Sequence, residues 1–317
     1  MTTVAKLEPS IKELKSVNIL SHVRYEHLVA GISGGVVSTL VLQPLDVIKI
    51  RFAANDGRSF PTMKYNSIVN AFTTITRTEG LYGLYRGVNP NCWGAGSSWG
   101  LYFLFYNTFK TWEQKRTGLA CLGPLEHSVA AAMSGALTLV LTNPLWVVKT
   151  RLCLQQDNQY KGMIDAFRKI YKAEGIRGYY RGFLPGLFGV THGAVQFVSY
   201  EEMKKLYIKY NNLPSNDQLG VTQYLTFAAL SKIIAAIATY PYQVLRTRLQ
   251  NQFCSYDGTI DCILRTYNFE GLKGFYKGLG TNLIRVTPAT MITFVTYENV
   301  SYFLLKFKKD TVIIENK

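Results

Sequence analysis

Six long apolar stretches follow one another along the chain, and they come in pairs. They lie near residues 25–54, 89–112, 126–155, 184–209, 222–252 and 281–306. Each exceeds the roughly 20 residues that an α-helix needs to cross the hydrocarbon core of a bilayer. The pattern therefore predicts an all-α membrane protein with six transmembrane helices.

A short amphipathic segment lies between the two members of each pair. These segments fall near residues 66–77, 162–173 and 258–268. Each gathers charged or polar side chains on one helical face, which is typical of a helix lying at the membrane surface. We therefore expect three short surface helices beside the six spans.

Two motifs recur three times in the same order, which indicates an internal repeat. The first motif lies in the first stretch of each pair and reads PLDVIKIR from Pro44, PLWVVKTR from Pro144 and PYQVLRTR from Pro241. The second motif begins 35, 30 and 29 residues after these prolines and reads EGLYGLYRG from Glu79, EGIRGYYRG from Glu174 and EGLKGFYKG from Glu270.

A third element falls within the second stretch of each pair and completes the repeat. It reads Tyr106-Asn107, Tyr200-Glu201 and Tyr297-Glu298. The six spans are therefore expected as three pseudo-symmetric two-helix repeats. We place the boundaries at 1–24 for an N-terminal tail, 25–119, 120–216 and 217–310 for the repeats, and 311–317 for a C-terminal tail.

Composition favours a membrane protein whose helices also touch water. Hydrophobic residues make up 48% of the chain and charged residues only 17%, below the roughly 25% of typical soluble domains. The mean hydropathy is nevertheless only +0.04. A bundle with a polar interior path explains both values, because one face of each helix then faces water.

The charge balance favours an anionic partner. Lys and Arg number 35 against 20 Asp and Glu, for a formal net charge of +15. Such an excess attracts nucleic acid, anionic lipid or acidic small molecules. We expect no nucleic-acid partner, because the basic residues are scattered along apolar segments and no binding motif gathers them.

Other classes of function lack the residues that they need. The five cysteines are odd in number and form no C-x-x-C pair, and the four histidines are scattered, so neither a disulfide scaffold nor a metal site is expected. Phosphate-binding loops, nucleophile elbows and H-E-x-x-H motifs are missing, so an enzyme is not expected. The first two dozen residues lack the composition of a cleaved presequence.

The proline motif has a physical consequence for one end of the bundle. A proline inside a helix removes a backbone hydrogen bond and bends the helix, and six kinked or tilted helices can narrow to a basket that is closed at one end. Asp46 and Lys49 lie three residues apart and share a helical face. Charges at this depth are costly unless they face water or each other. We expect a ring of bridges between repeats at this end.

The three repeats resemble the mitochondrial carrier family, whose repeats carry Pro-x-Asp/Glu-x-x-Lys/Arg. The resemblance covers roughly residues 25–306. It implies pseudo-threefold symmetry, alternating access between two polar gates, and a multi-pass location in the mitochondrial inner membrane. We expect a monomer.

The resemblance assigns the proline motifs to a matrix gate. It pairs Asp46 with Lys149, Trp146 with Arg246, and Gln243 with Lys49. The first pair is ionic, the second would be a cation–π contact, and the third a charge-assisted hydrogen bond. Two of the three acid positions are therefore occupied by uncharged residues.

The resemblance assigns a cytoplasmic gate to the third element of the repeats. It pairs Asn107 with Lys204, Glu201 with Ser301, and Glu298 with Lys110. Each gate then holds a single ionic link. Either the two gates are weakened together to keep the two states of a carrier close in energy, or the changes are neutral.

The glycines of the second motif resemble the family's lipid-binding turns. Helix N-termini expose unpaired amides that suit a phosphate. The resemblance implies cardiolipin as a bound lipid at Gly87, Gly162, Gly182, Gly258 and Gly278. Structural turns alone would also require glycine, and repeat one has Ser67 where a glycine would be expected.

Four residues are candidates for contact with the substrate. Arg285 is placed about midway along the last span, near a contact level used by the family. Lys232 lies 11 residues before Gln243, so the two share a helical face, and it either reaches the cavity or extends to the membrane interface. His192 and Gly189 occupy the corresponding stretch of repeat two. A lone histidine is more often a packed polar residue.

Within the family, Trp in place of the second acid resembles the subgroup that carries folate, FAD, pyrimidine nucleotides and NAD. Residues 91–103, 184–189 and 231–243, which include Pro-Tyr-Gln, favour FAD or folate (tetrahydrofolate) as cargo, with pyrimidine nucleotides or NAD as the alternative. The residues alone support a planar anionic metabolite and no resident cofactor. The rival of another class is a proton or anion leak channel.

Overall fold

Helices make up every regular element that the computed structural model describes. It describes residues 25–57, 65, 67–118, 123–155, 159–211, 220–254 and 256–315. The expected N-terminal tail 1–24 lies outside the described residues, as does Cys121. The prediction of an all-α chain is confirmed for the described part.

The long helices follow the expected pairs. The first helices of the three repeats are α2 (Tyr25–Ala54), α5 (Pro124–Leu154) and α9 (Val221–Gln250). The second helices are α4 (Val88–Thr117), α8 (Thr191–Tyr210) and α11 (Leu279–Glu315). Helix α11 continues to Glu315, so most of the expected C-terminal tail from residue 311 is helical.

The short helices also appear where the amphipathic segments predicted them. They are α3 (Ile68–Leu84), α6 (Met163–Tyr179) and α10 (Thr259–Glu270), with a short η2 (Leu272–Tyr276) after α10. Each of the three packs against the first helix of its own repeat through a small apolar core. Val47 and Ile75 join α2 to α3, Val148 and Ile170 lie in the core between α5 and α6, and Leu245 and Cys262 lie in that between α9 and α10.

One span differs from its prediction. The stretch expected as a single helix over 184–209 is divided into α7 (Phe183–Leu187), a 3₁₀ turn η1 (Phe188–Val190) and α8. Pro185, Gly186 and Gly189 lie at this point, and glycine and proline are the weakest helix formers. A 3₁₀ turn is a common interruption in such a sequence.

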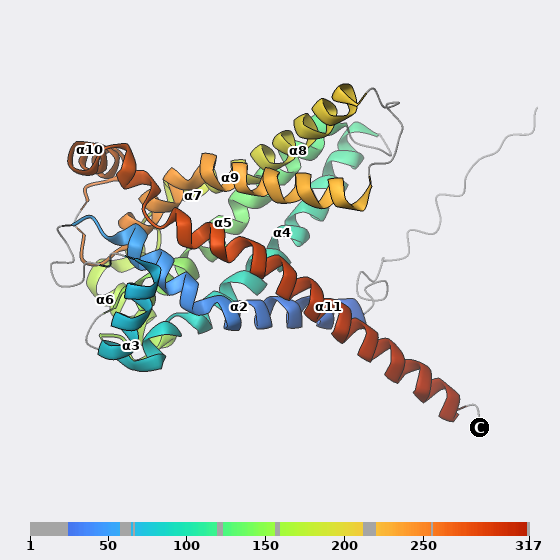
Figure 1. Cartoon of the computed structure of the whole chain (residues 1–317), viewed down its shortest axis with the longest axis horizontal. Helices are drawn as coiled ribbons and strands as arrows, with labels where there is room; N and C mark the ends of the chain where they lie inside the picture. Colours follow the sequence, from blue (N-terminus) through green and yellow to red (C-terminus); the bar gives the residue numbers. More distant parts are fainter. Residues whose placement is uncertain are drawn as a thin grey trace, which may run out of the picture.

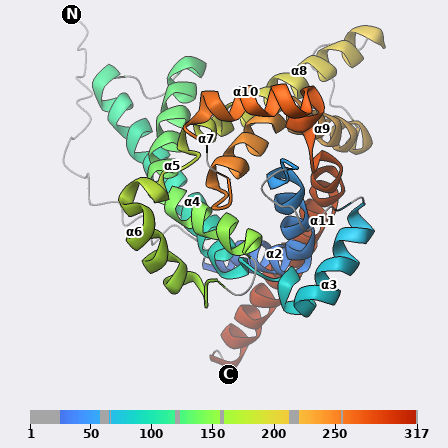
Figure 2. The same ribbon diagram turned by 90° about the vertical axis from the view of Figure 1, so that its left-hand side faces the viewer.

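The helices converge at one end of the molecule and diverge at the other (Figure 1). The end that carries α3, α6 and α10 is called the narrow end below. Seen from that end, the long helices form a ring with the three short helices on its outer side (Figure 2). Helix α4 packs along α5, α8 along α9, and α11 along α2, so the last helix of the chain closes the ring against the first.

The two helices of a repeat are not equally apolar. In the described part of the chain, the helices long and apolar enough to cross a membrane by composition are within Gly31–Ala54, Glu126–Leu154 and Thr222–Gln250. All three are first helices. Their partners α4, α8 and α11 have more polar positions, yet they fit the same six-helix arrangement.

Three turns approach a neighbouring repeat closely. Each ends the second motif with a glycine in the left-handed region: Gly87, Gly182 and Gly278, with φ of 76°, 70° and 87°. A Cβ atom there would lie 3.0, 2.9 and 3.0 Å from the carbonyl oxygens of Lys149, Arg246 and Lys49, respectively. Glycine is therefore required both by the backbone conformation and by the contact between repeats.

Replacing one of these glycines is expected to destabilise the fold. In Gly182→Ala the new Cβ meets a backbone carbonyl that cannot move freely, and the positive φ adds strain, for a cost of about 2–4 kcal/mol. The thermal unfolding of detergent-purified protein measures it. Gly193→Ala in α8, where the Cβ would meet nothing within 4 Å, is the control. Equal melting temperatures of the two variants would contradict the close approach.

Candidate functional site

The residue before each motif proline ties its helix to the turn of the same repeat. Gln43 Nε2 donates to the carbonyl of Arg86 at 2.9 Å, and Asn143 Nδ2 donates to that of Tyr179 at 2.7 Å. In repeat three the hydroxyl of Tyr240 donates to the carbonyl of Lys277 at 3.1 Å. All three side chains are fully buried. The prolines are thus held in place by a threefold set of buried bonds.

The arginine that ends each proline motif forms a buried ion pair with the glutamate of the second motif. Arg51 binds both oxygens of Glu79, Arg151 both oxygens of Glu174, and Arg248 both oxygens of Glu270. A further cation from the turn completes each group: Arg86 at 2.7 Å, Arg181 at 2.8 Å and Lys277 at 2.6 Å.

The same three arginines also link the repeats in a circle. Arg51 Nε donates to the carbonyl of Cys153 at 3.0 Å, Arg151 Nε to that of Gln250 at 3.3 Å, and Arg248 Nε to that of Ala53 at 3.1 Å. These carbonyls lie in the last turns of α5, α9 and α2, where carbonyl groups have no N–H donor within the helix. The set of three guanidinium groups is called the arginine ring below.

The arginine ring was missed by reasoning from the sequence. Both halves of each pair were recognised as repeated motifs, but the glutamates were assigned only to lipid-binding turns. The signal was the threefold recurrence of an Arg seven residues after the motif proline and of a Glu at the start of the second motif. Linking them required knowing that α3, α6 and α10 fold back under the first helices.

The pKa of Glu174 reflects the strength of its ion pair with Arg151. Burial alone raises the pKa of the Glu174 carboxyl, but the hydrogen bonds and charge of Arg151 and the charge of Arg181 lower this pKa below its ordinary value. The ionised form of Glu174 is therefore the favoured form in the folded chain.

The proline-motif gate residues meet above the arginine ring. Lys149 Nζ lies 3.4 Å from Asp46 Oδ2, and Lys49 Nζ donates to Gln243 Oε1 at 2.9 Å. These two predicted contacts are present. They join repeat one to repeat two and repeat three to repeat one, so the narrow end is closed in this structure.

The predicted cation–π contact of Trp146 with Arg246 is not formed in this structure. Lys149 of the same helix lies over the Trp146 ring at 5.3 Å, while Arg246 Nη2 donates to Asn143 Oδ1 at 3.2 Å. The indole lies against Gly94 of α4, where a Cβ would be 3.5 Å from the ring. Without a carboxylate at position 146, the guanidinium binds a neutral acceptor one turn away.

The predicted gate at the opposite end is not formed in this structure. None of the pairs Asn107–Lys204, Glu201–Ser301 and Glu298–Lys110 is joined by a hydrogen bond or ion pair, although all six residues are described. The physical reason is the divergence of the long helices away from the narrow end (Figure 1). One gate is therefore closed while the other is open.

Arg285 lies closer to the narrow end of the bundle than expected. It sits in the second turn of α11, not midway along it, and its Nε lies 2.6 Å from Asp46 Oδ1. Asp46 also accepts from the Asn91 amide at 3.2 Å. Arg285 thus belongs to the floor formed by the closed gate, with 29% of its side chain still exposed.

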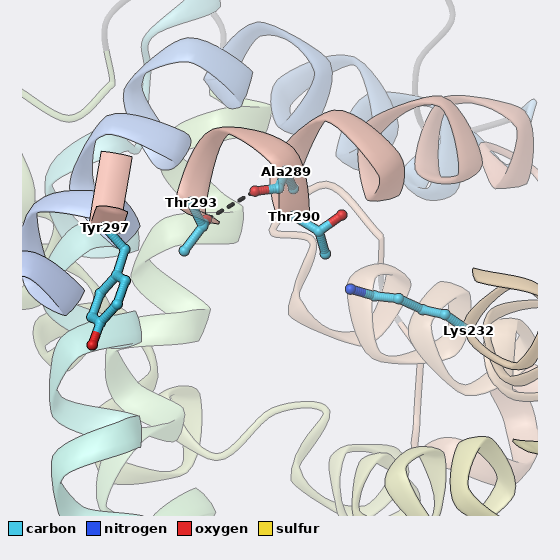
Figure 3. A pocket seen from close by; sticks show the side chains of 5 residues that line it. All are labelled: Lys232, Ala289, Thr290, Thr293 and Tyr297. Atoms are coloured by element: carbon cyan, nitrogen blue, oxygen red, sulfur yellow. Dashed lines mark hydrogen bonds between the residues drawn. The ribbon is translucent and has the colours of Figure 1, made fainter. Parts of the chain in front are cut away.

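Lys232 lines a cavity of about 460 Å³ between α9 and α11. Its side chain extends toward Thr290, and Thr293 and Tyr297 lie further along α11 (Figure 3). The cavity lies beyond Arg285 in the direction of the open end. Of the two alternatives for Lys232, the structure shows the one in which it reaches a cavity.

His192 and Gly189 take structural positions. His192 Nδ1 shares a 2.9 Å hydrogen bond with Thr239 Oγ1, which joins α8 to α9. A Cβ on Gly189 would lie 3.3 Å from the Tyr242 hydroxyl. Both residues contact the neighbouring helix, as expected of packed residues. Gly162 and Gly258 cap α6 and α10, with open space around them, so they remain candidates for lipid contact.

Comparison with known proteins gives the same picture for nearly the whole chain. The family model described as mitochondrial carrier protein matches residues 22–117, 122–211 and 217–308. Folate transporter 1, chloroplastic, of Arabidopsis thaliana is 41% identical over 291 residues, covering 87% of this chain and 94% of that protein.

Two further relatives are named for another cargo. Nicotinamide adenine dinucleotide transporter 2, mitochondrial, of Arabidopsis thaliana is 38% identical over 86% of this chain and 78% of its own length. Mitochondrial nicotinamide adenine dinucleotide transporter 1 of Saccharomyces cerevisiae is 37% identical over 85% of this chain and 74% of its own length.

Breaking one ion pair of the arginine ring is expected to destabilise the protein strongly. Glu174→Gln leaves Arg151, which is 1% exposed, without its carboxylate, at a cost of about 3–5 kcal/mol. Glu202→Gln removes the partner of the exposed Lys205 and should cost about 0–1 kcal/mol. Thermal unfolding in detergent compares them, and a small effect of Glu174→Gln would contradict the role of the ring.

Proposed function

The chain belongs to the mitochondrial carrier family, and from that membership we propose that it carries FAD or folate across the mitochondrial inner membrane by alternating access. The observation that supports this proposal is the opposite state of the two gates. The closed gate holds the pairs Asp46–Lys149 and Lys49–Gln243, while the three pairs expected at the other end are separate. This is the arrangement of a carrier open to one side.

The cavity favours an anionic cargo. Lys232 lines it together with the hydroxyl-bearing Thr290, Thr293 and Tyr297, and Arg285 lies about one helical turn before this wall on α11, at the closed gate. A carboxylate or phosphate would bind the two cations, and the hydroxyls offer hydrogen bonds to a planar ring system. Folate and FAD both combine such a ring with anionic groups.

The relatives favour folate and NAD as the two candidate cargos to compare first. A folate transporter is 41% identical to this chain, and NAD transporters are 37–39% identical. We prefer FAD or folate because Gln243 of the Pro-Tyr-Gln motif stands where other members of the subgroup carry an acid, whereas Trp146 resembles the subgroup as a whole. NAD is the second candidate, because three of these relatives are named as its transporters.

Thermal stabilisation of the purified protein and uptake into reconstituted vesicles test the cargo. A ligand that binds the folded state raises the melting temperature by mass action. We expect FAD or tetrahydrofolate to stabilise the protein and to be taken up, and NAD and pyrimidine nucleotides to have smaller effects. Stabilisation and uptake by NAD alone would overturn the preferred cargo but leave the carrier assignment intact.

A leak channel is separated from a carrier by its kinetics. We expect uptake that saturates with external substrate and that is accelerated by substrate inside the vesicle. A channel would give uptake that is linear in substrate and indifferent to the internal concentration. That second result would contradict alternating access.

Strengthening the closed gate is expected to slow transport. In Gln243→Glu the new carboxylate pairs with Lys49, whose Nζ already lies 2.9 Å from Oε1. An added stabilisation of about 1 kcal/mol would slow opening about fivefold, measured as turnover in reconstituted vesicles. Asn268→Asp, the same amide-to-carboxylate change at an exposed position of α10 at the same end, is the matched control. Equal turnover of both variants would remove Gln243 from the gate.

A further inference from the structure

A second cavity lies inside the closed gate itself. It has a volume of about 260 Å³ and is called the gate cavity below. Its charged lining residues are Lys49, Lys149, Arg246 and Asp46. Three cations therefore face a single carboxylate in a space enclosed by α2, α5 and α9.

The single carboxylate is already engaged. Asp46 is 4% exposed and lies 3.4 Å from Lys149 Nζ and 2.6 Å from Arg285 Nε. Arg285 adds a fourth positive charge at the edge of the gate. Asp46 thus has no capacity left to balance the other two cations of the gate cavity.

Lys49 and Arg246 bind only neutral acceptors. Lys49 Nζ donates to Gln243 Oε1 at 2.9 Å and lies 5.9 Å from the centroid of the Tyr240 ring. Arg246 Nη2 donates to Asn143 Oδ1 at 3.2 Å. Among the described residues no carboxylate lies within ion-pair distance of either cation. Both residues are only partly exposed, and a charge without a counter-charge becomes unfavourable as it loses contact with bulk water.

A buried amide adds a further donor to the same cavity. Gln250 is 2% exposed and lines the gate cavity, and its Oε1 accepts from Thr150 Oγ1 at 2.7 Å. Its Nε2 has no acceptor in the part of the chain that the structure describes. The unmatched groups of the gate cavity are therefore all positive or hydrogen-bond donors.

We propose that the gate cavity binds one small oxyanion, of the phosphate or carboxylate class, when the narrow end is closed. The oxyanion takes the place of the carboxylates that Trp146 and Gln243 do not provide, and it accepts from Lys49, Arg246 and Gln250. A water occupies about 30 Å³ of liquid, so the cavity has room for inorganic phosphate and several waters. The site does not depend on the identity of the cargo.

The test measures the melting temperature of the purified, cargo-free protein in inorganic phosphate at pH 7. Phosphate replaces a bulky sulfonate buffer at constant ionic strength. We expect a saturating rise of about 3–6 °C for the natural chain. Gln243→Glu supplies an internal carboxylate beside Lys49, so it should melt higher without phosphate and lose most of the phosphate response.

Two controls separate the site from a general effect of salt, since phosphate also stabilises proteins without binding a site. Asn268→Asp makes the same amide-to-carboxylate change at an exposed position outside the cavity and should keep the full response. If Gln243→Glu fails to fold, Lys49→Gln replaces it, and this loss of one cation should weaken the apparent phosphate affinity at least tenfold. An equal, unsaturating response of all variants would overturn the proposal.

Repeating the phosphate titration with saturating FAD or tetrahydrofolate distinguishes a free inorganic anion from an anionic group of the cargo as the occupant of the gate cavity. If the phosphate response disappears in the natural chain, an anionic group of the cargo occupies the gate cavity. If the response persists, the occupant is a free inorganic anion. Either result supports an anion site in the gate cavity. If the vesicles take up neither FAD nor tetrahydrofolate, that result contradicts the proposed function and leaves the anion site standing.

Discussion

The narrow end is governed by one constraint: every buried cation in it must find an acceptor. Arg51, Arg151 and Arg248 meet this constraint completely, each with two carboxylate oxygens and the carbonyl of a neighbouring repeat. The gate layer above them meets it only in part. The two layers therefore differ in strength. The arginine ring fixes the surface helices through three carboxylates, whereas the ion pairs described in the gate all depend on the single carboxylate of Asp46.

Threefold repetition made the architecture accessible from the sequence. The pairs of apolar stretches and the amphipathic segments between them correctly predicted the long and short helices, since hydrophobic periodicity is a local property. The interruption of the second long helix of repeat two, between Pro185 and Gly189, was not predicted. Weak helix propensity and packing against Tyr242 act together there. The sequence offers no simple way to weigh these two effects.

The contacts of the candidate site that follow from the order of the repeats were predicted correctly. The contacts that depend on competition between neighbouring side chains were not. Asp46 with Lys149 and Gln243 with Lys49 follow from the order of the repeats. Trp146 breaks the symmetry, and its large ring turns toward Gly94 instead of toward Arg246. Arg285 lies near the start of the expected stretch 281–306 as well as of α11, so its placement midway along the helix came from the family resemblance and not from the apolar pattern.

The circular order of the arginine ring has a consequence for biosynthesis. Arg248 in the last repeat donates to the carbonyl of Ala53 in the first, across almost two hundred residues. A nascent chain that has left the ribosome only through its second repeat lacks both this donor and the Gln250 carbonyl that Arg151 requires. The ring is therefore completed only after translation has passed its third member, and no single repeat can reach its final state before the others exist.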